Sequence, residues 1–303
     1  MNKAACVGVG LIGSSWAALL AWKGLTVYIH DLNIEITKRA LNEIHKILKL
    51  LTDLYGSEPK GEVIISKTLE EAVEDVEYVQ ESVVEDLKVK KDLFEKIDNI
   101  SKHEAIIASS TSGLRISEIQ RAVRNYPERC LIVHPFNPPH LMPLVEVVPG
   151  PETSRGVVGK VVDFMKKLGK NPIIVKKDVP GMVANRLQAA LWREAINLVV
   201  NAVVTPEEVD VAIRYGPGIR WALMGIFLTF HLGGGKGGIK YFMKSLEATF
   251  ENIWNDLASW TEYPENSMAT IEERVNEYLK GYDLEKLAEW RDKKIFEILK
   301  LIK

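Results

Sequence analysis

A histidine and a glutamate, twelve residues apart, are the strongest candidates for acid–base chemistry in this sequence. His134 ends the apolar run 130–134, and Glu146 interrupts the apolar run 144–148. Twelve residues allow a turn and a return strand, which would bring the carboxylate beside the imidazole. A buried carboxylate is costly unless it is paired, and such a pair would orient the imidazole as a general base. The alternatives are a structural histidine and a solvent-facing glutamate at a sheet edge.

Hydroxyl and amide side chains supply two further candidates. Ser112 lies in the run Ser-Ser-Thr-Ser-Gly-Leu, directly after a buried segment, where hydroxyls either bind a ligand or cap the next helix. Asn185 follows Pro180-Gly181 at the start of a long helical segment. Its amide would either donate to a substrate oxygen or tie two parts of the chain together. Beside a general base, both groups suit an oxygen on which negative charge develops.

The segment 7–16 carries the pattern Gly-x-Gly-x-x-Gly between an apolar run and a run of helix formers. Gly8 would allow a sharp turn, and Gly10 would let a pyrophosphate approach the backbone. Gly13 would let the helix lie close to the strand. The alternative is a glycine-rich turn without a ligand. The expected cofactor contacts of this turn are Gly8, Gly10, Leu11, Ile12 and Gly13.

A second strand-like run, 26–31, ends in an acid 18 residues after Gly13. Asp31 is placed there to accept hydrogen bonds from an adenosine ribose, and its charge would repel a 2′-phosphate. This order of strand, turn, helix, strand and acid predicts NAD as the cofactor. The pattern and the four polar candidates together suit oxidation of an alcohol, with hydride leaving for NAD. No group of Cys, His and acidic residues has zinc-ligand spacing, so no metal is expected.

Strand-like and helix-like runs alternate up to about residue 178, which predicts a parallel sheet with ligands at the carboxyl ends of its strands. The expected strands after residue 31 are 63–66, 78–82, 105–110, 130–134, 144–148 and 172–175. The expected helices are 33–55, as one helix or a helix pair, 69–73, 85–97, 116–124 and 154–168. From residue 180 onward only helices are expected, beginning with 182–203 and 206–215. The fold class is therefore α/β: a Rossmann-type doubly wound sheet domain over 1–179, followed by an all-helical substrate-binding and dimerisation domain over 180–303.

The composition argues against a nucleic-acid-binding protein and against a membrane protein. The 303 residues carry a net charge of −2, which provides no basic surface for nucleic acid. No uncharged apolar run reaches the length of a membrane span, and no signal peptide is expected before the first strand. Cys6 and Cys130 lie in apolar runs and are expected as buried thiols, so the chain should be cytoplasmic. The apolar helical half predicts a partner subunit.

Six stretches resemble the L-3-hydroxyacyl-CoA dehydrogenase family: VGVGLIGSSW, the strand ending in Asp31, QESVVEDLKVKKDLF, SSTSGL, HPFNPPHLMPLVEVV and DVPGMVANRLQ. The resemblance covers almost the whole chain. It implies that His134 is the general base, that Glu146 is its partner, and that Ser112 and Asn185 contact the substrate oxygen. It also implies that Asp31, Glu85, Lys90, Ser112 and Asn137 contact the cofactor, and that the helical domain forms a homodimer.

Two positions depart from the acyl-CoA enzymes, which usually carry Asn at the position of Ser110 and an aromatic or small residue at that of Pro135. Beyond residue 200 the sequence is more similar to the branch that acts without CoA on small free 3-hydroxy acids. L-Carnitine is then the first expected substrate, with L-gulonate and 3-hydroxybutyryl-CoA as alternatives. A crystallin-like structural or NAD-sensing protein is the non-enzymatic alternative. Aromatic residues such as Trp192 and Phe227 would hold a trimethylammonium group by cation–π attraction or form a dimer core.

Overall fold

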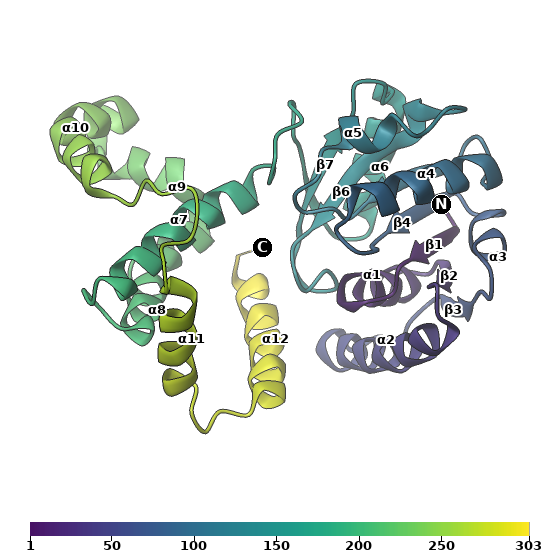
Figure 1. Ribbon diagram of the computed structural model, residues 1–303, viewed down its shortest axis with the longest axis horizontal. Helices are drawn as coiled ribbons and strands as arrows, with labels where there is room; N and C mark the ends of the chain where they lie inside the picture. The colour runs from purple at the N-terminus through teal and green to yellow at the C-terminus, as the bar shows by residue number, and fades with distance from the viewer. Residues whose placement is uncertain (303) are drawn as a thin grey trace. The chain divides into compact units, whose positions relative to one another are not determined.

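The computed structural model describes residues 1–302, which group into two compact units, residues 1–186 and the residues from 187 onward (Figure 1). The first unit contains one eight-stranded sheet in the order β3-β2-β1-β4-β5-β6-β7-β8. The strands are β1 (Lys3–Val7), β2 (Thr26–His30), β3 (Glu62–Ile65), β4 (Tyr78–Glu81), β5 (Ile106–Ser109), β6 (Cys130–Pro135), β7 (Leu144–Pro149) and β8 (Asn171–Ile174). Its helices are α1 (Leu11–Trp22), α2 (Ile34–Tyr55), α3 (Leu69–Val73), α4 (Leu87–Ile100), α5 (Ile116–Gln120) and α6 (Arg155–Lys167). The expected doubly wound sheet is confirmed.

All neighbouring strands are parallel except β6 and β7, which run antiparallel. The exception follows from the short connection between them, since a parallel crossover needs a dozen or more residues. The antiparallel register sets His134 directly opposite Glu146. The predicted return strand is therefore present, and it places the two candidate side chains as neighbours.

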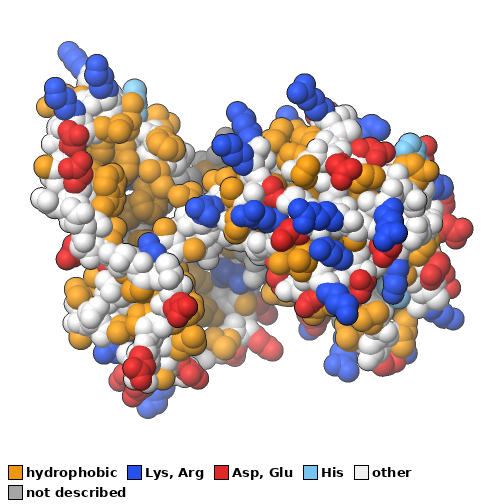
Figure 2. All heavy atoms as spheres, turned by 45° about the horizontal axis from the view of Figure 1, so that its top comes forward, with side chains coloured by type: hydrophobic (Ala, Val, Ile, Leu, Met, Phe, Trp, Pro, Cys, Tyr) orange, Lys and Arg blue, Asp and Glu red, His pale blue; other side chains and the backbone are white. Residues whose placement is uncertain are grey.

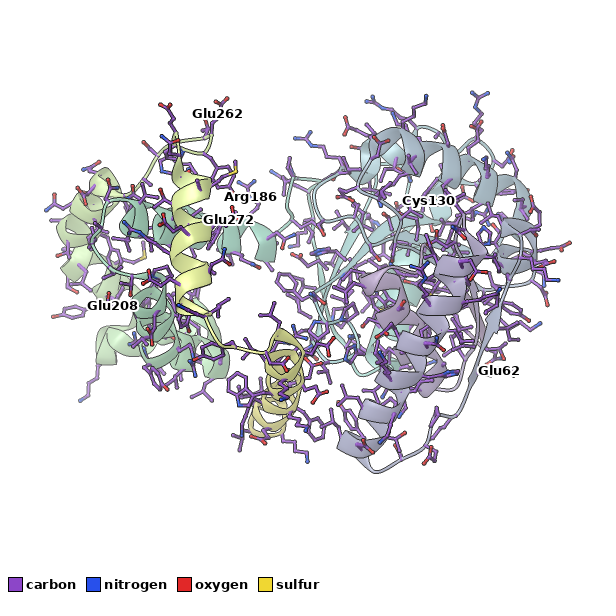
Figure 3. All side chains as sticks on the ribbon, turned by 60° about the horizontal axis from the view of Figure 1, so that its bottom comes forward. Glu62, Cys130, Arg186, Glu208, Glu262 and Glu272 are labelled. Atoms are coloured by element: carbon purple, nitrogen blue, oxygen red, sulfur yellow. The ribbon has the colours of Figure 1, made fainter. Side chains whose placement is uncertain are left out.

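The core lies on both faces of the sheet. Alternate residues of β1 enter opposite layers: Ala4 and Cys6 pack in one apolar cluster, Ala5 and Val7 in the other. This is the pattern of a strand that is buried on both sides. Cys6 and Cys130 are buried and form no disulfide, and burial raises the pKa of both thiols. Figure 3 labels Cys130.

The second unit is helical in the described residues. Its helices are α7 (Ala184–Val200), α8 (Pro206–Tyr215), α9 (Pro217–Gly233), α10 (Gly238–Asp256), α11 (Ser267–Tyr278) and α12 (Leu284–Leu301), and the first turn of α7 belongs to the sheet unit. The expected cap at Thr205 is confirmed, because its side chain and that of Glu208 bond each other's backbone N–H groups. No helix among residues 1–302 is both long enough and apolar enough to cross a membrane.

Along the chain, the division between the two units falls between residues 186 and 187, whereas the sequence analysis expects it between residues 179 and 180. The backbone N–H groups of Val183 and Ala184 donate to Glu146 on β7, so the start of α7 stays with the sheet. Met182 has a left-handed φ of 52°, which ends the helical conformation on that side. The helix therefore begins at Ala184 rather than at the expected residue 182.

Candidate active site

The glycine-rich turn between β1 and α1 has the geometry that a dinucleotide requires. Gly8 has a φ of 81°, and a Cβ on it would lie 2.7 Å from the backbone of Ser82. A Cβ on Gly13 would lie 1.9 Å from the carbonyl oxygen of Gly8. A Cβ on Gly10, by contrast, would meet nothing within 4 Å. The first and third glycines are thus required by packing, whereas the middle one leaves open space over the turn.

Helix α1 starts immediately after that open space. Gly10 is its N-cap and provides no side-chain acceptor for the first N–H groups of the helix. Those donors and the positive end of the helix dipole are suited to a phosphate. Leu11 is largely exposed beside the turn, and Ile12 is partly buried. These residues therefore fit the pyrophosphate of a dinucleotide.

Asp31 lies at the end of β2, where the sequence predicts it. Its Oδ2 accepts a hydrogen bond from the N–H of Val9 at 3.0 Å, and its Oδ1 accepts one from Leu32 at 2.8 Å. The carboxylate is thus fixed against the glycine-rich turn. Each oxygen keeps a further lone pair, so the group can still accept hydrogen bonds from a ribose.

His134 and Glu146 form a buried pair at the end of the sheet. The Nδ1 atom of His134 lies 2.9 Å from Oε2 of Glu146, and the two side chains are 5% and 0% exposed. A carboxylate only accepts hydrogen bonds, so Nδ1 carries the hydrogen. In the neutral imidazole the lone pair is then on Nε2, which is the form a general base needs.

The second oxygen of Glu146 is held by the start of α7. Its Oε1 accepts hydrogen bonds from the N–H groups of Val183 at 2.8 Å and Ala184 at 3.0 Å. Burial alone would raise the pKa of Glu146, but the hydrogen bonds from His134, Ala184 and Val183 outweigh it and lower that pKa. The carboxylate therefore stays ionised beside the imidazole. These backbone contacts have no counterpart in the sequence prediction.

Ser112 and Asn185 lie beside the pair. The Oγ atom of Ser112 is 3.2 Å from Nε2 of His134, and the side-chain amide of Asn185 donates to the carbonyl of Ser112 at 3.3 Å. Arg186, labelled in Figure 3, follows on the same helix and donates to the carbonyl of Pro180. The structure thus brings together all four residues that the sequence selected for chemistry.

Glu85 clamps the turn that carries Ser112. Its Oε1 accepts hydrogen bonds from the Thr111 hydroxyl at 2.5 Å and from the N–H groups of Ser112 and Gly113 at 3.0 and 2.8 Å. Burial opposes ionisation, but these bonds and the nearby Lys90 outweigh it and lower the pKa of Glu85. Thr111 is a further site residue. The sequence analysis includes Thr111 in its run of hydroxyl residues but does not select it as a site residue, although it directly precedes the selected Ser112.

Lys90 lies deeper than a direct cofactor contact would require. Its side chain is 1% exposed, and its Nζ lies 2.7 Å from the buried carboxylate of Glu81 and 3.5 Å from Glu85. It also donates to the carbonyl of Val83. The ammonium of Lys90 is therefore buried, and it contacts the partly exposed carboxylate of Glu85. Asn137, in contrast, is exposed on the connection after β6.

No group of three or more His, Cys, Asp or Glu side chains within residues 1–302 is arranged to hold a metal ion. The side chains themselves provide a positioned imidazole, a hydroxyl and an amide. These groups can remove a proton from an alcohol and hold the resulting oxygen.

Comparison with known protein families agrees with this chemistry. Residues 3–179 match the NAD binding domain of 3-hydroxyacyl-CoA dehydrogenase, and residues 181–273 match the C-terminal domain of the same family. The L-carnitine dehydrogenase of Bacillus cereus is 37% identical over 100% of this chain and 93% of its own length. That of Streptomyces coelicolor is 36% identical over 99% and 94%.

Two solved structures share the fold over most of the chain. A 5-formyl-3-hydroxy-2-methylpyridine-4-carboxylic acid 5-dehydrogenase, described as an NAD⁺-dependent dismutase, has a TM-score of 0.85 and 27% identity, covering 100% of this chain and 98% of its own. The 3-hydroxybutyryl-CoA dehydrogenase of Escherichia coli has a TM-score of 0.66 and 27% identity, covering 84% and 53%. The chain belongs to the 3-hydroxyacyl-CoA dehydrogenase family and is an NAD-dependent oxidoreductase that acts on a CH–OH group.

Proposed function

We propose that this chain oxidises the 3-hydroxy group of a small free acid to a 3-oxo group, and that L-carnitine is its substrate. The buried pair of His134 and Glu146, with Ser112 at 3.2 Å from Nε2, is the observation that carries the reaction class. The choice of L-carnitine is supported by the full-length relatives with that printed activity.

His134 has the central role in the proposed reaction. Its Nε2 takes the proton of the substrate hydroxyl, and Glu146 stabilises the imidazolium that forms. The Ser112 hydroxyl and the Asn185 amide hold the substrate oxygen while negative charge develops on it. When NAD is bound, it accepts the hydride. In the reverse direction the imidazolium returns its proton to the oxygen.

The residues proposed to hold NAD lie at or after the carboxyl ends of β1, β2, β4, β5 and β6. They are Gly8, Gly10, Leu11, Ile12, Gly13, Asp31, Glu85, Lys90, Ser112 and Asn137. The glycine-rich turn would take the pyrophosphate, and Asp31 the adenosine ribose. Lys90 would act by fixing Glu85, because its own ammonium is buried.

Replacing Asp31 by Asn is expected to weaken the preference for NAD over NADP roughly tenfold. The substitution removes the negative charge that repels a 2′-phosphate, and a charge pair near a surface contributes on the order of 1–4 kcal/mol. The measurement is the ratio of kcat/KM for the two cofactors at constant substrate. An unchanged ratio would mean that Asp31 does not face the ribose.

The proposed substrate is tested by comparing kcat/KM for L-carnitine, L-gulonate and 3-hydroxybutyryl-CoA under one set of conditions. We expect L-carnitine to give the highest value. The reason for this expectation is the printed activity of the full-length relatives. Turnover of the CoA ester alone would refute the proposal of L-carnitine while leaving the dehydrogenase chemistry in place.

The helical unit is proposed to form a homodimer. Large apolar side chains are exposed on it, including Leu191, Leu223, Phe227, Leu232, Tyr241 and Trp254, and Figure 2 shows hydrophobic side chains gathered on the visible face of this unit. Such a surface favours burial against a second copy. Sedimentation velocity should give twice the chain mass of 34.1 kDa, and the mass of a single chain would contradict the dimer. The two unpaired, buried thiols support a cytoplasmic location.

A further inference from the structure

The connection between β6 and β7 joins the strand that carries His134 to the strand that carries Glu146. It runs from residue 136 to residue 143, and its turn is closed by the N–H groups of Leu141 and Met142, which both donate to the carbonyl of Pro138. The remaining inward-facing carbonyls of this turn need donors from elsewhere, because buried carbonyl groups are costly when unpaired. The side chains of two residues distant in the sequence form hydrogen bonds with the connection.

Lys170 is the first of them. Its Nζ donates to the carbonyl of Pro139 and, at 2.8 Å, to the carbonyl of Met142. The same atom lies 5.4 Å from the centre of the Trp16 ring. The residue is 4% exposed, and Gly169, with a φ of 85°, turns the chain just before it. An ionisable side chain is thus buried against backbone carbonyls of the connection.

The amino group can hold both carbonyls in either protonation state. Burial, with a smaller contribution from Lys23, lowers the pKa of Lys170 to about 7. A neutral amine still carries two N–H bonds, and two carbonyls require two donors. The contact therefore persists on both sides of neutral pH.

Ser15 on α1 is the second residue. Its Oγ accepts a hydrogen bond from the backbone N–H of His140 at 2.9 Å and lies 2.8 Å from Nδ1 of the same residue. Ser15 is 1% exposed, and His140 is buried. Ser15 on α1 therefore bonds to His140 in the middle of the connection, and Lys170 bonds to the carbonyls on either side of His140.

We propose that Lys170 and Ser15 are positioning residues of this active site. By fixing the β6–β7 connection they keep His134 in register with Glu146 and hold Asn137 at the rim of the site. The inference rests on the proposed function, because it takes His134 as the general base. Neither residue touches the reacting groups. Their effect on the rate is indirect, and a displacement of His134 by about 1 Å can cost on the order of a hundredfold in rate.

The test compares Lys170→Met, Ser15→Ala and the control Lys23→Met by kcat at saturating substrate and NAD, per folded molecule. Amide hydrogen exchange at His140, Leu141 and Met142 is measured on the same samples. Lys170→Met is expected to lower kcat by roughly tenfold to a hundredfold and to speed exchange at these amides. Ser15→Ala should do the same to a smaller extent, and it remains informative if Lys170→Met does not fold. Lys23→Met removes a neighbouring lysine whose Nζ lies 4.7 Å from the Trp22 ring centre, and it should change neither measurement.

Two outcomes would overturn the proposal. One is a lower melting temperature with wild-type kcat and exchange in the folded variants, which would indicate a role in stability alone. The other is an equal effect of Lys23→Met, which would indicate a general response to lost charge. A failure of the proposed function is distinguishable, because His134→Gln measured in parallel would then keep its rate, while hydrogen exchange would still report on the two residues.

Discussion

His134→Gln is expected to slow NADH formation by roughly a hundredfold or more, with little change in the affinity for NAD. General-base catalysis typically contributes on the order of 10²–10⁴ in rate, and a glutamine amide cannot take a proton in this role. His134 is not among the residues proposed to hold NAD, so those residues are unchanged in the variant. The measurement is kcat with saturating substrate beside the dissociation constant of NAD.

Glu146→Gln is the matched control for this variant. Its amide would present N–H groups toward Nδ1 of His134, which now donates to a carboxylate at 2.9 Å. The hydrogen would then move to Nε2, and the lone pair would point away from the substrate hydroxyl. We expect a large rate loss with the imidazole still present. Wild-type rates in both variants would show that another group removes the proton.

Gly10→Val is expected to leave the protein folded but to weaken NAD binding by at least tenfold. A Cβ at this position meets nothing within 4 Å, so the added side chain projects into the open space over the turn. That space is where the pyrophosphate is proposed to approach the backbone. The measurements are the melting temperature without cofactor and the dissociation constant of NAD.

Gly13→Ala separates packing from binding in the same turn. Its Cβ would lie 1.9 Å from the carbonyl oxygen of Gly8, so the backbone must shift. We expect it to lower the free energy of unfolding by about 3 kcal/mol or more. If Gly10→Val bound NAD normally, or if Gly13→Ala were as stable as the wild type, the roles given to these glycines would be wrong.

Periodicity and turn residues were sufficient to predict most of the sheet unit, because its strands are continuous apolar runs. The helix at 69–73 has the predicted bounds, and the return strand containing Glu146 is present. Helix ends were less predictable because single caps determine them. The expected helix at 85–97 begins at Leu87, since the side chain of Asp86 accepts a hydrogen bond from Val89.

The sequence was sufficient to predict site residues that act through their side chains. It was not sufficient to predict contacts that the backbone makes. His134, Glu146, Ser112 and Asn185 could be selected by residue type and by their places at strand and helix ends. The N–H groups of Val183 and Ala184 that hold Glu146 have no sequence signature, because any residue except proline supplies them. The burial of Lys90 depends on Glu81, which lies within an apparently ordinary strand. The backbone donors to Glu146 and the buried pair of Lys90 and Glu81 both arise from tertiary packing, which the sequence pattern does not show.

The most direct test of the proposed mechanism is a crystal structure with NADH and L-carnitine, a pair that cannot react by hydride transfer. We predict that the 3-hydroxyl oxygen lies about 2.6–3.2 Å from Nε2 of His134, within hydrogen-bond reach of a general base. A substrate bound with that oxygen away from His134, or with the imidazole separated from Glu146, would contradict the mechanism.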